Sequence, residues 1–274
     1  MPELPEVETV RRYLAPVVEG RRLVEVELRH PRTSRRNASP SDVVDRLRGT
    51  VVQRLDRAGK FLLGQLDSGL TWVTHLGMSG RILVTGRNDP EVPHTHFIVR
   101  TEAGDDVRLV DPRTFGFVAV FTPEELAAQL HLGRDALSDL PRSPQLGAKL
   151  AGRTAPIKSL LLDQRIVAGL GNIYADEVLH RARVRPTRAA GQLTPAEIAL
   201  LRGSIKPVLR AGIAAGGTSL SDLAYLLPDG QAGDYLDRLR VYGREGLPCG
   251  RCGSAIERVV VGGRSSFFCP KCQV

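Results

Sequence analysis

Short apolar stretches separated by turn-forming residues dominate the first 130 residues of the chain. A helical pattern over residues 5–18 comes first, with Glu6 and Glu8 near the positive end of the helix dipole. Breaks such as Asp67-Ser68-Gly69 then separate apolar stretches at residues 23–28, 50–55, 60–66, 70–75, 80–85, 97–101, 107–110 and 115–121. About eight short strands at this spacing predict a β-sandwich or barrel.

From residue 123 the spacing of apolar residues becomes helical. Thr194-Pro195-Ala196-Glu197 has the form of a capping box with proline at the first helical position. A helix should therefore begin there, run toward Gly216-Gly217 and kink at Pro207.

The run Gly169-Leu170-Gly171-Asn172 has the form of a helix boundary. The glycines should end one helix, and Asn172 should cap the next. A helix N-terminus with an amide at its mouth can hold a phosphate, and Arg153 and Lys158 lie just upstream. Gly-x-Gly turns are usually only structural. This pattern alone therefore does not indicate a phosphate site, and other motifs in the chain must support it.

The net charge of +8 lies entirely in the C-terminal half of the chain. Residues 1–130 hold 18 Lys+Arg and 18 Asp+Glu, whereas residues 131–274 hold 20 and 12. This distribution favours nucleic acid as a partner over a merely solvated basic surface. No apolar run reaches membrane-spanning length, and the acidic start does not match a secretory signal peptide, so we expect a cytoplasmic protein without membrane contact.

All four cysteines lie in the last 26 residues, as Cys249, Cys252, Cys269 and Cys272. Two Cys-x2-Cys pairs can point four thiolates at one ion, which predicts a zinc site in preference to disulfides in a reducing cytosol. The apolar stretches on either side of Gly262-Gly263 predict a β-hairpin between the pairs. A four-cysteine shell has no open position, so the zinc should be structural and should replace a core in this small module.

The chain begins Met1-Pro2-Glu3, and this start can be interpreted as chemistry. If Met1 is removed, Pro2 carries the free α-amine. A generic α-amine is roughly 14% unprotonated at pH 7, which is an upper bound for the more basic proline nitrogen. Attack on an anomeric carbon would give an iminium ion, with Glu3 as a neighbouring acid. However, many chains start Met-Pro, and termini are usually frayed.

Taken together, the motifs resemble those of the Fpg family, the bacterial formamidopyrimidine-DNA glycosylases. The resemblance covers essentially the whole chain. It rests on Pro-Glu-Leu-Pro-Glu-Val-Glu at 2–8, Ala-Gly-Lys-Phe at 58–61, His-Leu-Gly-Met-Ser-Gly at 75–80, Asp-Pro-Arg-Thr-Phe-Gly at 111–116, Gly-Leu-Gly-Asn-Ile-Tyr-Ala at 169–175, Gly-Gly-Thr-Ser-Leu at 216–220, Val-Tyr-Gly-Arg at 241–244 and the four cysteines.

The resemblance implies an α+β multidomain protein that binds DNA in a cleft between its halves. An N-terminal helix and catalytic β-sandwich would occupy residues 1–130. A helix–two-turn–helix domain with a lesion-capping loop would follow at residues 131–242, and a β-hairpin zinc finger at residues 243–274. The expected partner is double-stranded DNA with an oxidised base, bound by a monomer at the nucleoid.

The resemblance also implies catalytic roles for four residues. Pro2 corresponds to the nucleophile that forms a Schiff base with the damaged nucleotide's sugar, and Glu3 corresponds to its acid/base partner. Lys60 matches a lysine that assists β-elimination. Arg264, on the zinc hairpin, matches an arginine that contacts the phosphate and assists δ-elimination.

Further residues match the family's DNA contacts. Three of them match residues that fill the space left by a flipped base and face its orphaned partner: Met78, Arg113 and Phe115. Filling this space replaces the stacking that the flipped base loses. The remaining matches are phosphate or DNA contacts at His75, His94, Arg153, Lys158 and Asn172. Taken singly, each of these residues is more typical of a core, a strand or a solvated surface. Their joint pattern favours the functional interpretation.

The function implied is a bifunctional DNA glycosylase and abasic-site lyase that removes 8-oxoguanine and formamidopyrimidines and nicks the strand by β,δ-elimination. Two alternatives are an endonuclease VIII-like glycosylase for oxidised pyrimidines and a non-enzymatic zinc-ribbon DNA-binding protein. A zinc hydrolase or deaminase is disfavoured because no open metal site with a His-x-Glu partner is found. The segment from Thr218 to Tyr235 departs from the family's usual glycine and aromatic pattern, which leaves lesion preference open.

Overall fold

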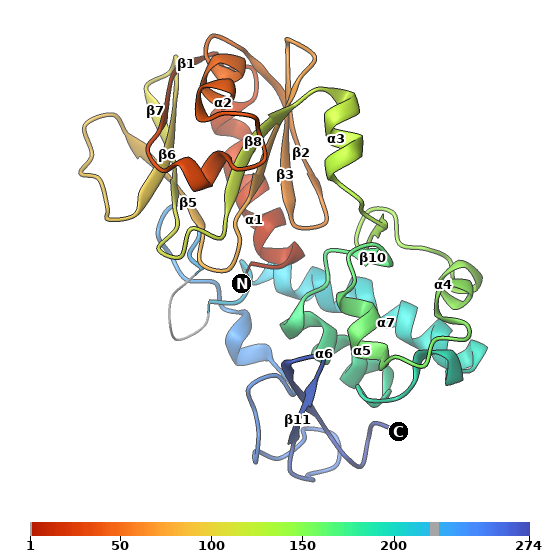
Figure 1. The fold of residues 1–274 in the computed structure, drawn as a ribbon. Coiled ribbons are helices and arrows are strands. Elements are labelled where there is room, and N and C mark those ends of the chain that lie inside the picture. The colour runs from red at the N-terminus through yellow and green to blue at the C-terminus, as the bar shows by residue number, and fades with distance from the viewer. Residues whose placement is uncertain (1, 220–224) are drawn as a thin grey trace. The chain divides into compact units, whose positions relative to one another are not determined.

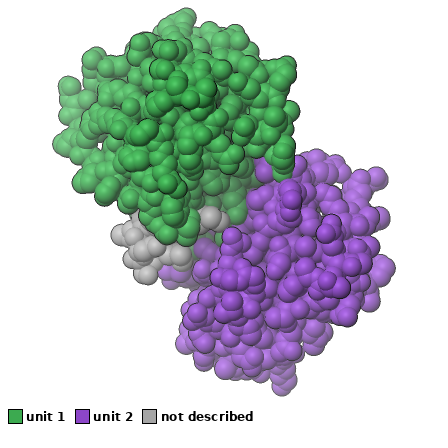
Figure 2. Space-filling model, in the orientation of Figure 1, with its two compact units in different colours: residues 1–131, 215–234 green, residues 132–214, 235–274 purple. Residues whose placement is uncertain are grey.

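The computed structural model of the chain describes residues 2–219 and 225–274 (Figure 1). It contains two compact units, one of residues 1–131 and 215–234 and the other of residues 132–214 and 235–274 (Figure 2). The expectations for Met1 removal, and for the part of the lesion-capping loop at residues 220–224, lie outside the described residues.

The described part of unit 1 holds two four-stranded antiparallel sheets with strand orders β1-β6-β7-β5 and β2-β3-β4-β8. Each stretch expected as a strand forms one, and the second moves furthest, from residues 50–55 to Val52–Ala58. The strands are β1 (Leu23–Leu28), β2 (Val52–Ala58), β3 (Phe61–Leu66), β4 (Thr71–His75), β5 (Arg81–Gly86), β6 (Thr95–Thr101), β7 (Asp105–Val110) and β8 (Phe117–Phe121).

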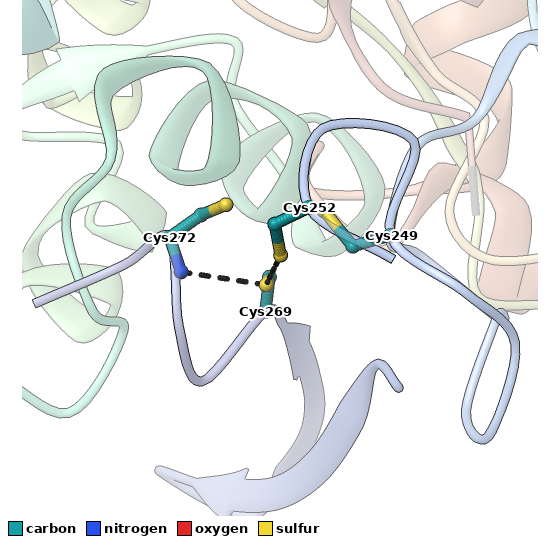
Figure 3. A group of neighbouring side chains, drawn as sticks. All are labelled: Cys249, Cys252, Cys269 and Cys272. Atoms are coloured by element: carbon teal, nitrogen blue, oxygen red, sulfur yellow. Dashed lines mark hydrogen bonds between the residues drawn. The ribbon is translucent and has the colours of Figure 1, made fainter. Parts of the chain in front are cut away.

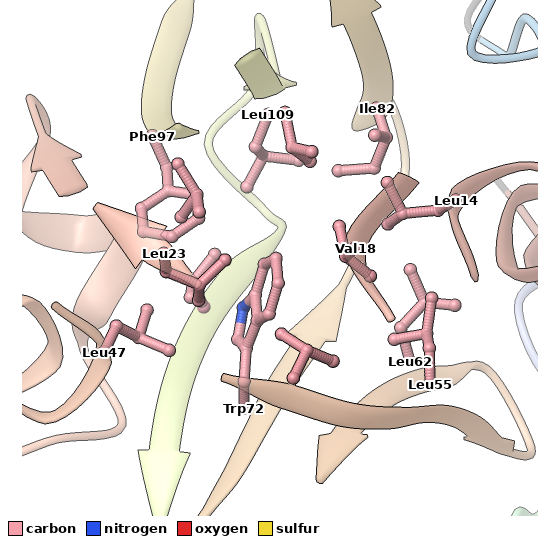
Figure 4. Close-up of a cluster of buried hydrophobic side chains, with 14 of the residues drawn as sticks. Leu14, Val18, Leu23, Leu47, Leu55, Leu62, Trp72, Ile82, Phe97 and Leu109 are labelled. Carbon is pink, nitrogen blue, oxygen red and sulfur yellow. The ribbon is translucent and has the colours of Figure 1, made fainter. Parts of the chain in front are cut away.

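The hydrophobic core of unit 1 lies between the two sheets, which confirms the expected sandwich (Figure 4). Trp72 of β4 and Phe97 of β6 meet there with their ring centroids 6.1 Å apart. Helix α1 (Leu4–Val18) buries Val10 and Leu14 in the same cluster. Each such side chain contributes about 1.5–3 kcal/mol when fully buried, so the sandwich holds α1, and with it the start of the chain, in place.

Unit 1 also contains a helix that the apolar pattern did not predict, α2 (Pro40–Leu47), which follows the 3₁₀ turn η1 (Pro31–Ser34). The Asp42 N–H donates to the Ser39 hydroxyl at 3.2 Å, and Pro40 occupies the first turn. The sequence signal for a helix start was therefore present. However, the apolar positions of α2 are too few to show a helical period. Helix α3 (Pro123–Gln129) begins where a helical pattern was expected.

Residues 215–219 and 225–234 group with unit 1, whereas the sequence placed them in the domain of residues 131–242. The Thr218 N–H donates to Glu6 Oε1 at 2.8 Å, and the Val84 N–H donates to the Pro228 carbonyl at 3.2 Å. The Tyr225 side chain is 3% exposed and belongs to the sandwich core. These contacts join the segment to α1 and β5 and move it out of the helical unit.

Unit 2 is built mainly of helices and ends in a hairpin. Its elements are β9 (Arg134–Asp135), α4 (Ser143–Leu150), α5 (Ile157–Leu162), β10 (Val167–Ala168), α6 (Asn172–Ala182), η2 (Ala190–Gln192), α7 (Pro195–Ala214), η3 (Tyr235–Arg238), β11 (Glu257–Val261) and β12 (Arg264–Phe268). The hairpin β11–β12 is the one expected between the cysteine pairs, and both turn residues, Gly262 and Gly263, have positive φ.

Helix α7 begins with the predicted capping box. The Thr194 N–H donates to Glu197 Oε2 at 2.8 Å, and the Glu197 N–H donates to the Thr194 hydroxyl at 3.3 Å. The helix continues through Pro207. A Cβ atom at Gly212 would lie 2.6 Å from the Tyr174 ring, so glycine allows α7 to approach α6 closely.

Candidate functional site

The start of the chain is held in place, and not frayed, at the head of α1. Pro2 and Glu3 are both buried, with Glu3 1% exposed. The Glu3 N–H donates to Glu6 Oε2 at 2.8 Å, while Glu6 Oε1 accepts the Thr218 N–H at 2.8 Å. One carboxylate thus links the first helical turn to the 215–219 segment and fixes the backbone next to the Pro2 nitrogen.

Lys60 and His75 lie close together in unit 1. Lys60 is 7% exposed in the turn between β2 and β3, and His75 ends β4. Burial, followed by the charges of Lys60, Arg35 and Arg36, lowers the pKa of His75 to about 4. The imidazole is therefore neutral at pH 7. Its Nδ1 accepts the Gly77 N–H at 3.1 Å, so Nε2 carries the proton and can donate a hydrogen bond.

Two loops of unit 1, residues 75–80 and 111–116, pack backbone against backbone; we call them the paired loops. A Cβ atom at Gly77 would lie 2.5 Å from the Phe115 carbonyl carbon, so the approach requires glycine. Met78 and Phe115 project from the paired loops with 40% and 39% of their surfaces exposed. The Arg113 guanidinium lies 4.8 Å from the Phe115 ring centroid. The structure thus brings all three predicted void-filling residues together, and neither Met78 nor Phe115 belongs to the core.

Asp111 organises the paired loops, a role that sequence reasoning missed. Its side chain is 2% exposed and accepts hydrogen bonds from the Ser79 hydroxyl at 2.6 Å, the Gly116 N–H at 2.7 Å and the Arg113 N–H at 3.3 Å. The signal was its position directly before Pro112, because Asp commonly bonds to backbone N–H groups further along a turn. His94 is exposed, and its carbonyl accepts the Asp111 N–H at 3.0 Å. Its φ is 66°, a conformation uncommon outside glycine.

In unit 2, the helix boundary differs from the expected one. Short strand β10, and not a helix, precedes Gly169, and Gly171 is the N-cap of α6. Asn172 is the first helical residue, and its Nδ2 donates to the Ser265 carbonyl at 3.2 Å. Glycine is also tolerated at the N-cap position, and Gly171 occupies it here. The Asn172 side-chain amide is therefore available to bind strand β12.

Lys158 cannot make the phosphate contact that the resemblance implied. Its side chain is fully buried, and its Nζ lies 2.7 Å from Asp176 Oδ1 and 2.9 Å from the Ser265 carbonyl. Asp176 Oδ2 also accepts the Phe267 N–H at 2.9 Å. Burial raises the pKa of Asp176, against the opposing effect of Lys158. The pair is structural and attaches β12 to α5 and α6.

Arg153 and Arg264 are both exposed, as phosphate contacts require. Arg264 is the first residue of β12, directly after the Gly262-Gly263 turn. Its position depends on the Lys158–Asp176 pair, since that pair holds the next residues of the strand.

The four cysteines form a metal site at the base of the hairpin (Figure 3). Their Sγ atoms all lie within 4.8 Å of one another, and those of Cys252 and Cys269 are 3.5 Å apart. A tetrahedral zinc ion with Zn–S bonds of about 2.3 Å requires sulfur atoms about 3.8 Å apart, so the cluster fits one zinc ion. All four cysteines lie in the described part of the chain, and each is free of disulfide bonds. The closed thiolate set makes this zinc structural.

Both cysteine pairs are attached to the C-terminal end of α6 or to the residues just after it, through side chains that sequence reasoning missed. The Arg251 guanidinium donates to the His180 carbonyl at 2.7 Å, and the Gln273 amide donates to the Val184 carbonyl at 2.9 Å. Glu177, buried on α6, accepts the backbone N–H groups of residues 240–242 at 2.9–3.1 Å. The sequence signal for these contacts was the pair Asp176-Glu177 at the end of the run 169–177. A buried carboxylate needs hydrogen-bond donors such as backbone N–H groups.

A cavity of about 630 Å³ in unit 2 lies beside these contacts, and Glu177, His180 and Arg251 line part of it. Its lining also includes Pro207 and Arg238 but none of the predicted site residues. Among the described residues, no helix is long and apolar enough to cross a membrane.

Three family models match the chain. They are the formamidopyrimidine-DNA glycosylase N-terminal domain at residues 1–118, the formamidopyrimidine-DNA glycosylase H2TH domain at residues 132–223, and a zinc finger found in FPG and IleRS at residues 246–274.

Individual proteins match over almost their full length. Formamidopyrimidine-DNA glycosylase from Phenylobacterium zucineum is 46% identical over 263 residues, covering 90% of each chain. The crystal structure of the MutM (Fpg) protein from Thermus thermophilus is 42% identical, with a TM-score of 0.88 over 99% of this chain and 98% of that one. A Lactococcus lactis Fpg mutant, solved with DNA containing Fapy-dG, is 33% identical, with a TM-score of 0.91 over 99% of both chains.

Proposed function

Because the chain belongs to the formamidopyrimidine-DNA glycosylase family, we propose that it excises oxidised purines from duplex DNA and then nicks the strand at the abasic site. The substrates would include 8-oxoguanine and formamidopyrimidines. The observation that carries the proposal is the buried Pro2-Glu3 pair, held at the head of α1 by Glu6. A zinc-ribbon DNA-binding protein gives no reason for that pair. An endonuclease VIII-like activity has less support, since the relatives share the formamidopyrimidine-DNA glycosylase name.

In the proposed reaction, the Pro2 amine bonds to the C1′ atom of the damaged nucleotide as the bond from C1′ to the base breaks; the base leaves with a proton, and the amine loses one. The C1′–O4′ bond of the sugar then breaks, with Glu3 donating a proton to O4′. The product is an iminium ion between Pro2 and the sugar, an electron sink that acidifies the neighbouring C2′–H. Glu3 exchanges protons at the sugar, as the adjacent carboxyl group. The ordered first turn of α1 supports this assignment because a nucleophile must be held in position.

Strand cleavage would follow in two eliminations. We assign Lys60 to assist β-elimination and Arg264 to bind the phosphate and assist δ-elimination. Arg264 lies in the unit that also carries Asn172 and Arg153, so this unit would supply phosphate contacts, consistent with its positive charge.

Recognition of the lesion would rest on the paired loops. Met78 and Phe115 are exposed apolar side chains suited to fill the space of a flipped base, and Arg113 can donate to the orphaned partner. His75 would contact a phosphate as a neutral donor, and His94 would be a further DNA contact.

We further propose the division of labour that the motifs suggest. Residues 1–130 would carry base excision and β-elimination. Residues 131–242 would bind DNA and cap the lesion, with residues 215–219 and 225–234 packed in the unit of residues 1–131. Residues 243–274 would form the zinc finger that supplies Arg264. The protein would act as a monomer on duplex DNA in the nucleoid, without a membrane.

Borohydride trapping on a duplex with one 8-oxoguanine opposite cytosine tests the covalent step. We expect intact-mass analysis to show Met1 missing and reduction to trap the chain on DNA. Pro2→Gly should still trap, since glycine supplies an amine. A chain extended by an uncleaved N-terminal tag, in which Pro2 forms an amide, should not trap. Efficient trapping of that tagged chain through a lysine would refute the assignment.

A further inference from the structure

Two arginines, Arg32 in the η1 turn and Arg35 directly after it, bind three consecutive carbonyl groups of the loop that carries Phe115. Arg32 Nε donates to the Thr114 carbonyl at 3.2 Å. Arg35 Nη2 donates to the Phe115 carbonyl at 2.8 Å, and Arg35 Nη1 donates to the Gly116 carbonyl at 2.6 Å. The arginines lie about 80 positions upstream of the loop, so these are tertiary contacts.

The Arg35 guanidinium has a geometry that other side chains cannot reproduce. It spans two successive loop carbonyls while Nη1 also donates to the Arg32 carbonyl of its own turn at 2.8 Å. Its Cζ lies 5.3 Å from the Phe117 ring centroid. A planar guanidinium presents such donors in a fixed fork and stacks on aromatic rings, whereas a lysine ammonium is a single point donor.

The loop needs this support because part of it is strained. Thr114 has φ of 54°, a left-handed conformation that a β-branched residue rarely adopts. Such a conformation persists only where the surroundings impose it. Asp111 accepts two N–H groups of the loop, and Arg32 and Arg35 bind three of its carbonyls.

Holding residues 115 and 116 also holds Met78. The Gly77 backbone packs directly against that of Phe115 and Gly116, so the paired loops cannot move independently. A displacement of the Phe115 carbonyl would carry both exposed apolar side chains with it.

We propose that Arg35, assisted by Arg32, is a positioning residue that pre-sets the paired loops for insertion into the duplex. This inference rests on the proposed function, in which Met78 and Phe115 fill the space of the flipped base. Pre-organised loops lose less conformational freedom when they insert. Arg35 therefore acts on base excision and contributes little once the base is gone.

Arg35→Gln and Arg36→Gln form a matched pair for the test. Arg36 carries the same charge and lies 5.2 Å from the same Phe117 ring, but in the described part of the chain its side chain bonds to Gln129 and not to the loop carbonyls. Single-turnover rates are measured at saturating enzyme on 8-oxoguanine opposite cytosine and on a preformed abasic site. Thermal unfolding confirms that each variant is folded.

We expect Arg35→Gln to slow 8-oxoguanine excision roughly 10- to 100-fold and abasic-site cleavage less than about 3-fold. Arg113→Ala should show the same split, and Arg36→Gln should change both rates less than about 3-fold. A 2-aminopurine beside the lesion should report reduced unstacking by Arg35→Gln before the chemical step. Arg35→Lys should fall between wild type and Arg35→Gln, because one donor of the fork remains.

Three outcomes would overturn the inference. The first is equal effects of Arg35→Gln and Arg36→Gln, which would indicate a general charge effect. The second is equal slowing of both substrates by Arg35→Gln, and the third is a wild-type excision rate for Arg35→Lys. A wild-type protein that processes neither substrate would instead refute the proposed function.

Discussion

Lys158 and Arg153 lie five positions apart and carry the same charge, but their surroundings give them different tasks. Lys158 is fully buried against Asp176, whereas Arg153 is exposed. Removing one partner of a buried ion pair leaves the other without compensation, which is far more costly than losing an exposed charge. We therefore expect Lys158 to contribute to stability and Arg153 to DNA affinity.

Lys158→Met should lower the free energy of unfolding by about 3 kcal/mol, because the Asp176 carboxyl group then stays buried without its cation. Arg153→Gln should change stability by less than about 0.5 kcal/mol and reduce the salt dependence of DNA binding by about one phosphate contact. Urea denaturation and fluorescence anisotropy at several salt concentrations measure these effects. A Lys158→Met protein of wild-type stability with a reduced salt slope would restore Lys158 as a phosphate contact.

At the scale of elements, Glu8 attaches helix α1 to strand β2. Its carboxylate accepts hydrogen bonds from Arg11 Nη2 at 2.9 Å and Arg12 Nε at 2.8 Å on the helix. It also accepts one from Arg57 Nε at 3.2 Å on the strand. Burial by itself would raise the pKa of Glu8. The hydrogen bonds from Arg11 and Arg12 and the charges of Arg11 and Arg57 outweigh burial and lower the pKa to about 2.

The depressed pKa of Glu8 predicts how acid destabilises the protein. Since the folded value of about 2 lies below the ordinary 4.5, the contribution of Glu8 is complete above pH 4.5 and is lost as the pH falls toward 2. Glu8→Gln should be about 2 kcal/mol less stable than wild type at pH 7, allowing for partial solvent screening. The difference should shrink below pH 4.5. The exposed control Asp45→Asn should change stability by less than about 0.5 kcal/mol at pH 7. A constant Glu8→Gln deficit from pH 7 to 2 would contradict the assignment.

The strands of the sandwich were predictable from local sequence because their core-facing positions recur within each stretch. The short helix α2 was missed because it buries only Val43 and Leu47. The cysteine site followed from spacing, and the fit of its sulfur atoms confirms it. Partners far apart in the chain left no local signal. Two examples are the ion pair between Lys158 and Asp176 and the hydrogen bond from Thr218 to Glu6.

At the scale of the whole molecule, we expect the zinc site to support DNA binding and to leave the stability of the sandwich unchanged. Cys249→Ser should lose zinc and weaken DNA binding, because the metal orders the hairpin that carries Arg264. Trp72, the sole tryptophan of the chain, is 4% exposed in the sandwich core, so its fluorescence should be unchanged. Arg264→Ala should keep zinc but also bind DNA less tightly. A zinc-free Cys249→Ser protein with undiminished DNA affinity would contradict this account.

The contacts of the 215–219 and 225–234 segments have a consequence for dividing the chain. The polypeptide passes from one unit to the other after residues 131, 214 and 234, so no single cut yields two complete units. A fragment of residues 1–131 would lack Tyr225, whose buried ring fills part of the sandwich core. The complementary fragment would carry that ring without the sandwich core that buries it. Fragment complementation would therefore depend on returning this internal segment to its site, as donor-strand exchange does in other assemblies.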